Sequence, residues 1–184
     1  SNPDTWAISA DLADHAAACA LVDQAGQLAG GPLSGLVNSA SVFDYDTPGA
    51  MNIEAFDKAM AVNLRAPALL SERFAAQADP ARDNCIVNML DQKLWAMNPD
   101  FYSYTMSKAA LLAATDMMAR AFAPAVRVNA IAPGLLLPSY DQTREEFETV
   151  ASRNPMQRPI ALDDVSSALE FLMSNAALTA QVMH

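Results

Sequence analysis

The stretch Cys85-Ile86-Val87-Asn88-Met89-Leu90, with Asp91 directly after it, decides the fold. A short apolar run of this length is typical of a strand buried in a parallel sheet. Residues 107–122 follow, rich in Ala, Leu and Met and without Gly or Pro, and this composition predicts a buried helix. A second apolar run at 126–131 ends in Ala132-Pro133-Gly134. Strand, helix and strand of these lengths predict a βαβ unit and an α/β fold.

Tyr104 and Lys108 stand at positions i and i+4 near the start of the predicted helix, so they share one of its faces. A lysine ammonium beside a phenol favours the phenolate, so we expect the pKa of Tyr104 to fall from its usual value of about 10. Such a phenol can give a proton to the oxygen or nitrogen of a substrate being reduced. The alternative interpretation is a solvated helix face on which this spacing arose by chance.

Polar residues also follow an earlier predicted strand. Gly35-Leu36-Val37 leads into Asn38-Ser39-Ala40-Ser41, and a predicted helix over 53–76 carries Asn63 inside an apolar stretch. Ligands of open α/β sheets bind off the carboxyl ends of strands, so Asp91 and residues 38–41 should meet at that edge. An unpaired buried amide costs about 1–3 kcal/mol, so Asn63 is either a functional amide or a hydrogen-bonded core amide that bends its helix.

In their order along the chain, these pieces resemble the short-chain dehydrogenase/reductase family, and the resemblance covers essentially all 184 residues. Residues 38–41 are similar to its Asn-Asn-Ala-Gly strand end, and Asn63 to its helix asparagine. Tyr104 and Lys108 match its catalytic pair, and Pro133-Gly134 matches the turn after its sixth strand. Asp11-Leu12, after the strand-like residues 6–9, resembles its adenine-contacting dipeptide. The resemblance implies a doubly wound parallel sheet of the Rossmann type, with three α/β/α layers and one domain over residues 1–184.

The resemblance further implies a nicotinamide cofactor, NADPH in preference to NADH, a small-molecule substrate and a homotetramer. Tyr104 would donate or relay the proton, Lys108 would tune it and reach the nicotinamide ribose, and Asn63 would hold a water that links Lys108 to solvent. The positions that match the family's cofactor site are Asp11, Leu12, Asn38, Ser39, Ala40, Ser41, Met89, Tyr104, Lys108, Pro133, Gly134 and Leu136.

At two positions this chain departs from the common family pattern, and both departures point to one branch of the family. Most members carry a serine thirteen residues before the tyrosine, where this chain has Asp91, and the aromatic Phe43 closely follows the strand end. Both features resemble the pteridine reductase branch, which includes dihydromonapterin and dihydrofolate reductases and stacks its pterin between such an aromatic ring and the nicotinamide. An ionised carboxylate only accepts hydrogen bonds, which suits a ring with N–H donors. We therefore expect a pterin- or dihydrofolate-like substrate to contact Ser41, Phe43, Asp91 and Tyr104.

Other interpretations stay open. Asp91 could be a helix cap or surface acid and Phe43 a core aromatic, which would fit a ketone, sugar or acyl carbonyl reductase of the same family. A non-catalytic relic or binding scaffold is a third possibility, since none of the six glycines forms the phosphate-holding turn of such folds. The resemblance to the family begins at its third strand. After the Pro-Gly turn, Pro138-Ser139-Tyr140 departs from the family's usual hydroxyl-bearing position. We expect the first βαβ portion and a C-terminal tail to be missing from these residues.

Composition limits the compartment and the partners. The chain is 52% hydrophobic and carries a net charge of −10, which argues for one sizeable core and against nucleic acid or anionic membrane partners. Cys19 and Cys85 lie in apolar contexts and indicate thiols in a reducing, cytoplasmic setting. His15 and His184 give no metal-ligand spacing, so we expect no metal. Neither a signal peptide nor a span of roughly 20 apolar residues is visible.

Overall fold

The structure is a computed structural model that describes residues 5–138 and 142–184. Its strands are β1 (Gly35–Asn38), β2 (Asn84–Met89), β3 (Val126–Ile131) and β4 (Val182–Met183). Its helices are α1 (His15–Ala29), α2 (Ile53–Ala59), α3 (Ala66–Gln77), α4 (Tyr102–Phe122), α5 (Arg144–Ala151) and α6 (Leu162–Ser174). A π-helical segment, Met60–Arg65, joins α2 to α3, and a 3-10 turn, Gln92–Trp95, follows β2.

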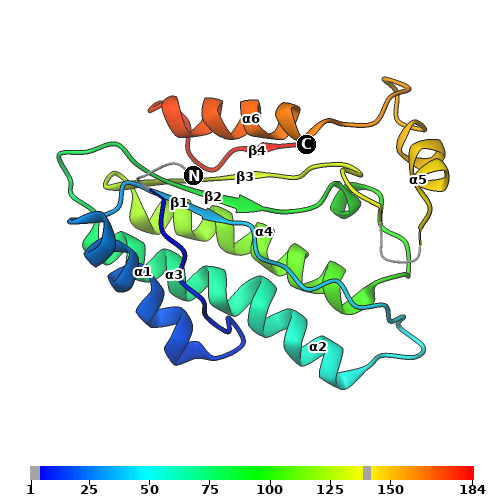
Figure 1. Cartoon of the computed structure of the whole chain (residues 1–184), viewed down its shortest axis with the longest axis horizontal. Helices are drawn as coiled ribbons and strands as arrows, with labels where there is room; N and C mark the ends of the chain where they lie inside the picture. Colours follow the sequence, from blue (N-terminus) through cyan, green and yellow to red (C-terminus); the bar gives the residue numbers. More distant parts are fainter. Residues whose placement is uncertain (1–4, 139–141) are drawn as a thin grey trace.

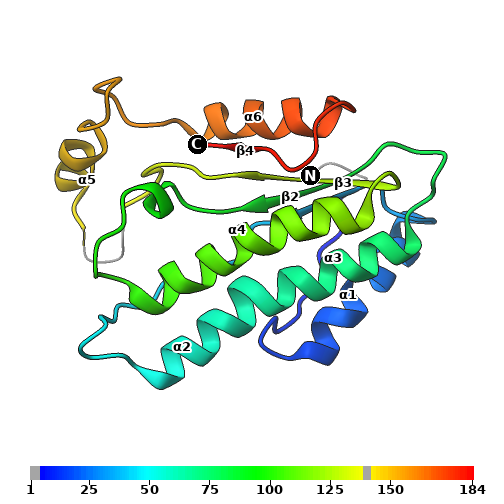
Figure 2. The same cartoon turned by 180° about the vertical axis from the view of Figure 1, so that it is seen from behind.

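The four strands form one parallel sheet in the order β1-β2-β3-β4. In its register Val37 lies beside Val87, and Val87 lies beside Asn129. Helices α1, α3 and α4 cover one face of the sheet and α6 covers the other (Figures 1 and 2). The predicted three-layer α/β/α architecture with a parallel sheet is therefore confirmed.

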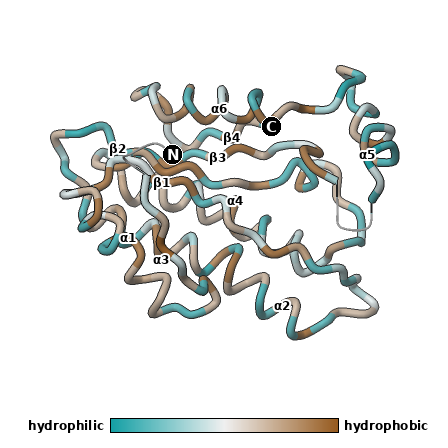
Figure 3. Tube along the Cα trace, in the orientation of Figure 1, coloured by the Kyte–Doolittle hydropathy of each residue, from teal (hydrophilic) through white to brown (hydrophobic). Residues whose placement is uncertain are grey.

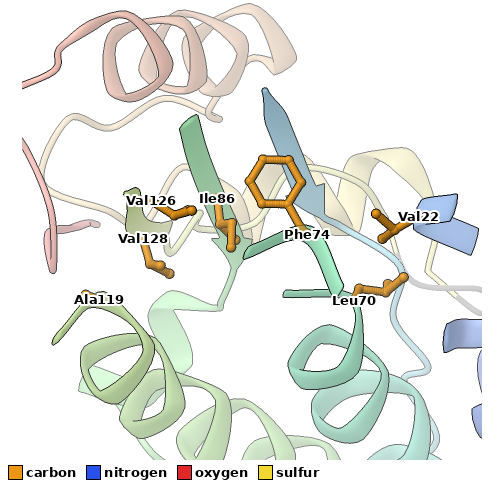
Figure 4. Close-up of a cluster of buried hydrophobic side chains, with 7 residues drawn as sticks. All are labelled: Val22, Leu70, Phe74, Ile86, Ala119, Val126 and Val128. Atoms are coloured by element: carbon orange, nitrogen blue, oxygen red, sulfur yellow. The ribbon is translucent and has the colours of Figure 1, made fainter. Parts of the chain in front are cut away.

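The hydrophobic core is built around β2 and β3, whose residues are almost all buried. On the face covered by three helices, Phe74, Ile86 and Val128 pack with Val22 and Leu70, as Figure 4 shows. A second cluster, formed by Cys85, Val87, Ile131 and Leu172, lies between the sheet and α6. Hydrophobic residues accordingly run along the strands that the helices enclose (Figure 3). This packing fixes the strands whose carboxyl ends carry the polar residues.

Three sequence predictions need correction. The helix predicted over 53–76 is interrupted by the π-helical segment, which contains the fully buried Asn63. The helix predicted from residue 107 already begins at Tyr102, so Tyr104 lies in its first turn. Residues 6–9 form no strand, because none of the described residues pairs with them. In the same described ranges, no helix combines the length and apolar character that a membrane span requires.

Candidate active site

Polar and aromatic side chains meet at the carboxyl ends of the strands, as the fold predicts. They enclose a pocket of about 460 Å³ between the segment after β1, the start of α4 and the segment after β3. Its lining consists of Ser41, Phe43, Asp91, Phe101, Tyr104, residues 134–138, Gln142 and Val150. All four residues expected to contact the substrate are thus brought together.

Asp91 is held at both of its carboxylate oxygens. Oδ1 accepts the backbone N–H of Lys93 at 2.8 Å and caps the 3-10 turn, while Oδ2 accepts the hydroxyl of Tyr104 at 2.7 Å. Asp91 therefore both caps the 3-10 turn and contacts Tyr104 in the pocket, so the two interpretations of this residue do not exclude each other. Because the cap fixes the orientation of the carboxylate, the oxygen that faces Tyr104 cannot rotate away without breaking a second hydrogen bond.

Tyr104 is 7% exposed, and its environment opposes ionisation. Burial, followed by the negative charge of Asp91 and its hydrogen bond, raises the pKa of Tyr104 well above the ordinary value. The prediction that Lys108 lowers this pKa is wrong for this structure. The Lys108 ammonium lies 5.7 Å from the centre of the Tyr104 ring and donates to the carbonyl of Met89 at 2.7 Å. Tyr104 consequently keeps its proton at neutral pH.

Lys108 lies on the same face of α4 as Tyr104, as predicted, and is 3% exposed. Burial lowers the pKa of Lys108 to about 8, and the negative charge of Asp91 opposes this shift. The ammonium therefore remains mostly protonated near pH 7, with the Met89 carbonyl as a hydrogen-bond acceptor. The positive charge of Lys108 is thus held near the face of the Tyr104 ring, and the Tyr104 hydroxyl contacts the Asp91 carboxylate.

Asn63 uses both ends of its amide. Its Oδ1 accepts the backbone N–H of Val42 at 2.8 Å and the hydroxyl of Ser41 at 3.2 Å. Its Nδ2 donates to the carbonyl of Val42 and to the hydroxyl of Ser107, both at 3.0 Å. The interpretation as a hydrogen-bonded core amide in a bent helix fits this arrangement. The amide fastens the segment after β1 to α4.

Phe43 is 47% exposed and lines the pocket, so the interpretation as an ordinary core aromatic is wrong. One face of its ring stacks on Phe101, with centroids 4.0 Å apart and planes at 12°. The Tyr104 ring meets it edge to face, with centroids 4.6 Å apart. The pocket therefore presents an aromatic wall directly beside the phenol.

The residues predicted to bind cofactor fall into separate groups. Leu12, Asn38, Ser39 and Ala40 line a smaller cavity of about 140 Å³ at the end of β1. Gly134 and Leu136 line the larger pocket, while the Pro133 carbonyl accepts the N–H of Gln92 at 3.1 Å. Asp11 lies in an exposed turn and accepts the N–H of Ala13. Ser139 and Tyr140 lie outside the described residues.

Sequence reasoning missed several residues that shape this site. Phe101 precedes α4 with a left-handed backbone (φ 55°), which no local pattern indicates. Asp46 reaches the first turn of α4 from a distant loop, so its contact depends on tertiary structure. Ser107 is the exception, because its place on the Tyr104–Lys108 face could have marked it as a buried polar residue.

Comparison with known proteins identifies a matching family model and several related proteins. A family model described as Enoyl-(Acyl carrier protein) reductase matches residues 1–184. A crystal structure of FolM alternative dihydrofolate reductase 1 from Brucella canis, complexed with NADP, is 40% identical with a TM-score of 0.90, and the match covers 96% of this chain and 69% of that one.

Two curated relatives act on other substrates according to their names. A probable galactose dehydrogenase of Rhizobium meliloti is 30% identical over 96% of this chain and 71% of its own length. An NADPH-dependent aldehyde reductase of Arabidopsis thaliana chloroplasts is 27% identical over 95% of this chain, which spans 66% of that protein.

Proposed function

This chain belongs to the short-chain dehydrogenase/reductase family, and from that premise we propose that it reduces a pterin- or dihydrofolate-like ring with NADPH, with Tyr104 as proton donor. The observation that carries the proposal is the Asp91 carboxylate in hydrogen-bond contact with the Tyr104 hydroxyl, beside the exposed ring of Phe43. The 40% identity to a dihydrofolate reductase solved with NADP supports both the substrate class and the cofactor.

The residues present fit the nicotinamide end and one further contact region of a nicotinamide cofactor. Asn38 lines the small cavity together with Leu12, Ser39 and Ala40, and its buried Oδ1 has no hydrogen-bond partner among the described residues. Lys108 and Tyr104 would hold the nicotinamide half, as the family resemblance implies, and Asp11, Met89, Pro133, Gly134 and Leu136 would complete the surroundings. When bound, NADPH supplies the hydride.

Reduction of a ring C=N bond adds a hydride to carbon and a proton to nitrogen. The Tyr104 hydroxyl, which keeps its proton at neutral pH, turns from the Asp91 oxygen that accepts it and donates that proton to the ring nitrogen. Asp91 accepts hydrogen bonds from ring N–H groups and orients the Tyr104 hydroxyl. Phe43 offers a face for stacking, and Ser41 lines the same pocket.

A carbonyl reductase is the second candidate, because the galactose dehydrogenase and aldehyde reductase relatives bear names of that chemistry. Asp91 disfavours it. The oxygen of a carbonyl becomes negative as the hydride arrives, and a carboxylate beside it raises the energy of that state. A serine at this position would instead donate a hydrogen bond to that oxygen.

The decisive experiment follows NADPH oxidation by absorbance with dihydrobiopterin, dihydrofolate and a panel of small ketones and aldehydes. We expect turnover of a pterin by the wild type, and a loss of that turnover in Asp91→Ser with a gain on carbonyls. Asp79→Ser is the matched control, since Asp79 also caps a turn, through the N–H of Ala81, but lies outside the pocket lining. A wild type that reduces a ketone, ignores every pterin and is unaffected by Asp91→Ser would replace the first candidate with the second.

The assembly and location are also proposals. A homotetramer follows from the family resemblance and would be built on the long helices that carry Asn63 and Tyr104. Light scattering of the purified protein tests the tetramer. A cytoplasmic location stays a prediction from the cysteine contexts.

A further inference from the structure

We propose that Asp46 is a positioning residue that holds the aromatic wall of the pocket against the proton donor. The inference rests on the proposed function, because the geometry that Asp46 fixes is that of Phe43 relative to Tyr104. Asp46 lies three positions after Phe43 and is 3% exposed, although it is a carboxylate in a surface segment.

Asp46 contacts the first two residues of α4 in three ways. Its Oδ1 accepts the backbone N–H of Ser103 at 2.9 Å, and its Oδ2 accepts the hydroxyl of Ser103. Its backbone carbonyl accepts the N–H of Tyr102 at 3.2 Å. These N–H groups have no partners within the helix itself, since the first turn of any α-helix leaves its donors unpaired.

Asp46 acts as a helix cap supplied from elsewhere in the chain. Phe101, the residue at the capping position, makes no side-chain cap hydrogen bond. The negative charge of Asp46 lies at the end of α4 where the helix dipole is positive, which favours a buried carboxylate there. Tyr104 follows Ser103 directly, so the cap fixes the turn that carries the phenol.

The segment 42–46 is fastened to α4 at both of its ends. At one end Asn63 links Val42 to Ser107, and at the other end Asp46 holds Ser103. Ser103 and Ser107 are one helical turn apart. Phe43 lies between these two attachments, and Tyr104 lies between the two serines.

Loss of one attachment frees Phe43 to move relative to Tyr104. Two outer ties of this segment are exposed, from the Tyr45 hydroxyl to Asp100 at 3.3 Å and from Asp44 to Lys58 at 3.6 Å. They join the segment to the residue before Phe101 and to α2, so neither holds α4. A shift of about 1 Å in a positioned group costs up to about 10²-fold in rate. Asp46 therefore acts through Phe43 and Tyr104, with no contact of its own to the pocket.

The test compares Asp46→Ala with Asp46→Asn in the full chain, with Asn52→Ala as control. Asn52 caps α2 through the N–H of Ala55 and lies outside the pocket lining, so its loss reports the effect of a missing cap alone. We expect Asp46→Ala to lower kcat and raise KM for the ring substrate, together by about 10–10²-fold, with an unchanged Kd for NADPH. Asp46→Asn retains an acceptor for the Ser103 N–H and should restore most of the activity.

A readout that needs no substrate separates this proposal from the proposed function. Nuclear Overhauser contacts between the labelled rings of Phe43 and Tyr104 should be present in the wild type, Asp46→Asn and Asn52→Ala, and lost in Asp46→Ala. If no pterin is turned over but these contacts behave as stated, the proposed function fails and the positioning role stands. Ring contacts that persist in Asp46→Ala, or an equal loss in Asn52→Ala, would overturn it. Should Asp46→Ala not fold, Ser103→Ala removes the hydroxyl contact alone and should give a smaller loss of the same kind.

Discussion

Two parts of α4, residues 102–108 and residues 109–122, bury different kinds of side chain. The first part buries Ser103, Tyr104, Thr105, Ser107 and Lys108, all of them polar. The second part buries Leu111 and Ala119, with Thr115 as its polar member, and Thr115 accepts a hydrogen bond from Asn88 and donates to the Leu111 carbonyl. The first part of the helix is therefore organised around polar contacts and the second around packing.

The difference separates the part of the helix that stabilises the fold from the part that carries the proposed chemistry. Apolar burial stabilises the folded state by about 25 cal/mol per Å², whereas a buried charge costs free energy unless it is paired. Lys108 has a carbonyl as its partner and a lowered pKa, which records part of that cost. The polar face therefore costs stability, and we infer that it serves the proposed function. Substitutions in the two parts of the helix should accordingly separate activity from stability.

The largest effect is expected from Tyr104→Phe, which removes the proton and keeps the ring. General-acid loss should lower kcat by about 10²–10⁴-fold, while the thermal midpoint and NADPH binding change little. Steady-state kinetics and thermal melts of the same samples measure both quantities. Tyr102→Phe is the control in the same turn of α4, because Tyr102 does not line the pocket. Retention of more than about a tenth of wild-type kcat would remove Tyr104 from the mechanism.

Much of this contrast could be predicted from the sequence, because it depends on local patterns. The spacing of Tyr104 and Lys108, and Asp91 at the end of an apolar run, predicted that these three candidate residues lie together at one sheet edge, as they do. The start of α4 could not be predicted, since its first donors are paired by Asp46 from a loop far away in sequence. The raised pKa of Tyr104 could not be predicted from the sequence either, because it depends on burial and on the contact between the phenol and the Asp91 carboxylate.

Leu111→Ala should give the opposite result in the second part of the helix, residues 109–122. Leu111 is fully enclosed with Leu90, Ala130 and Ala132, so its truncation leaves a cavity and should lower the free energy of unfolding by about 2–5 kcal/mol. Urea denaturation measures this change, and Leu112→Ala, at a half-buried position, should cost less. The kcat of the protein that remains folded should stay within severalfold of the wild type. A loss of kcat as large as that of Tyr104→Phe would contradict the division of the helix.

Lys108→Met tests how much free energy the buried ammonium costs, through the pH dependence of the free energy of unfolding. The pKa of Lys108 falls from 10.5 to about 8 on folding, so the unfolded chain binds more protons between these values. The free energy of unfolding of the wild type should therefore rise with pH from about 8, by at most about 1.4 kcal/mol per pH unit. Lys108→Met should show no such rise. Melts between pH 8 and 10 avoid the opposite contribution of Tyr104, whose raised pKa acts only above its ordinary value of 10.0. Burial also raises the pKa of Cys85 from its ordinary value of 9.0, which opposes the rise within this window in both proteins, so the difference between wild type and Lys108→Met is the quantity compared.

Phe43→Ala should give the smallest effect, because Phe43 contacts the polar first part of α4 without belonging to it. Aromatic stacking contributes about 0.5–1.5 kcal/mol beyond burial, which predicts a KM for a dihydropterin raised severalfold or more with a modest change in kcat. Phe43→Leu keeps the apolar volume and removes the flat ring, so it isolates the stacking. Tyr45→Ala is the control, since Tyr45 also packs on Phe101 but is exposed and does not line the pocket. If both Phe43 variants raise the KM no more than Tyr45→Ala does, the ring of Phe43 serves only to cover Phe101, and the stacking surface for the substrate must be sought elsewhere in the pocket.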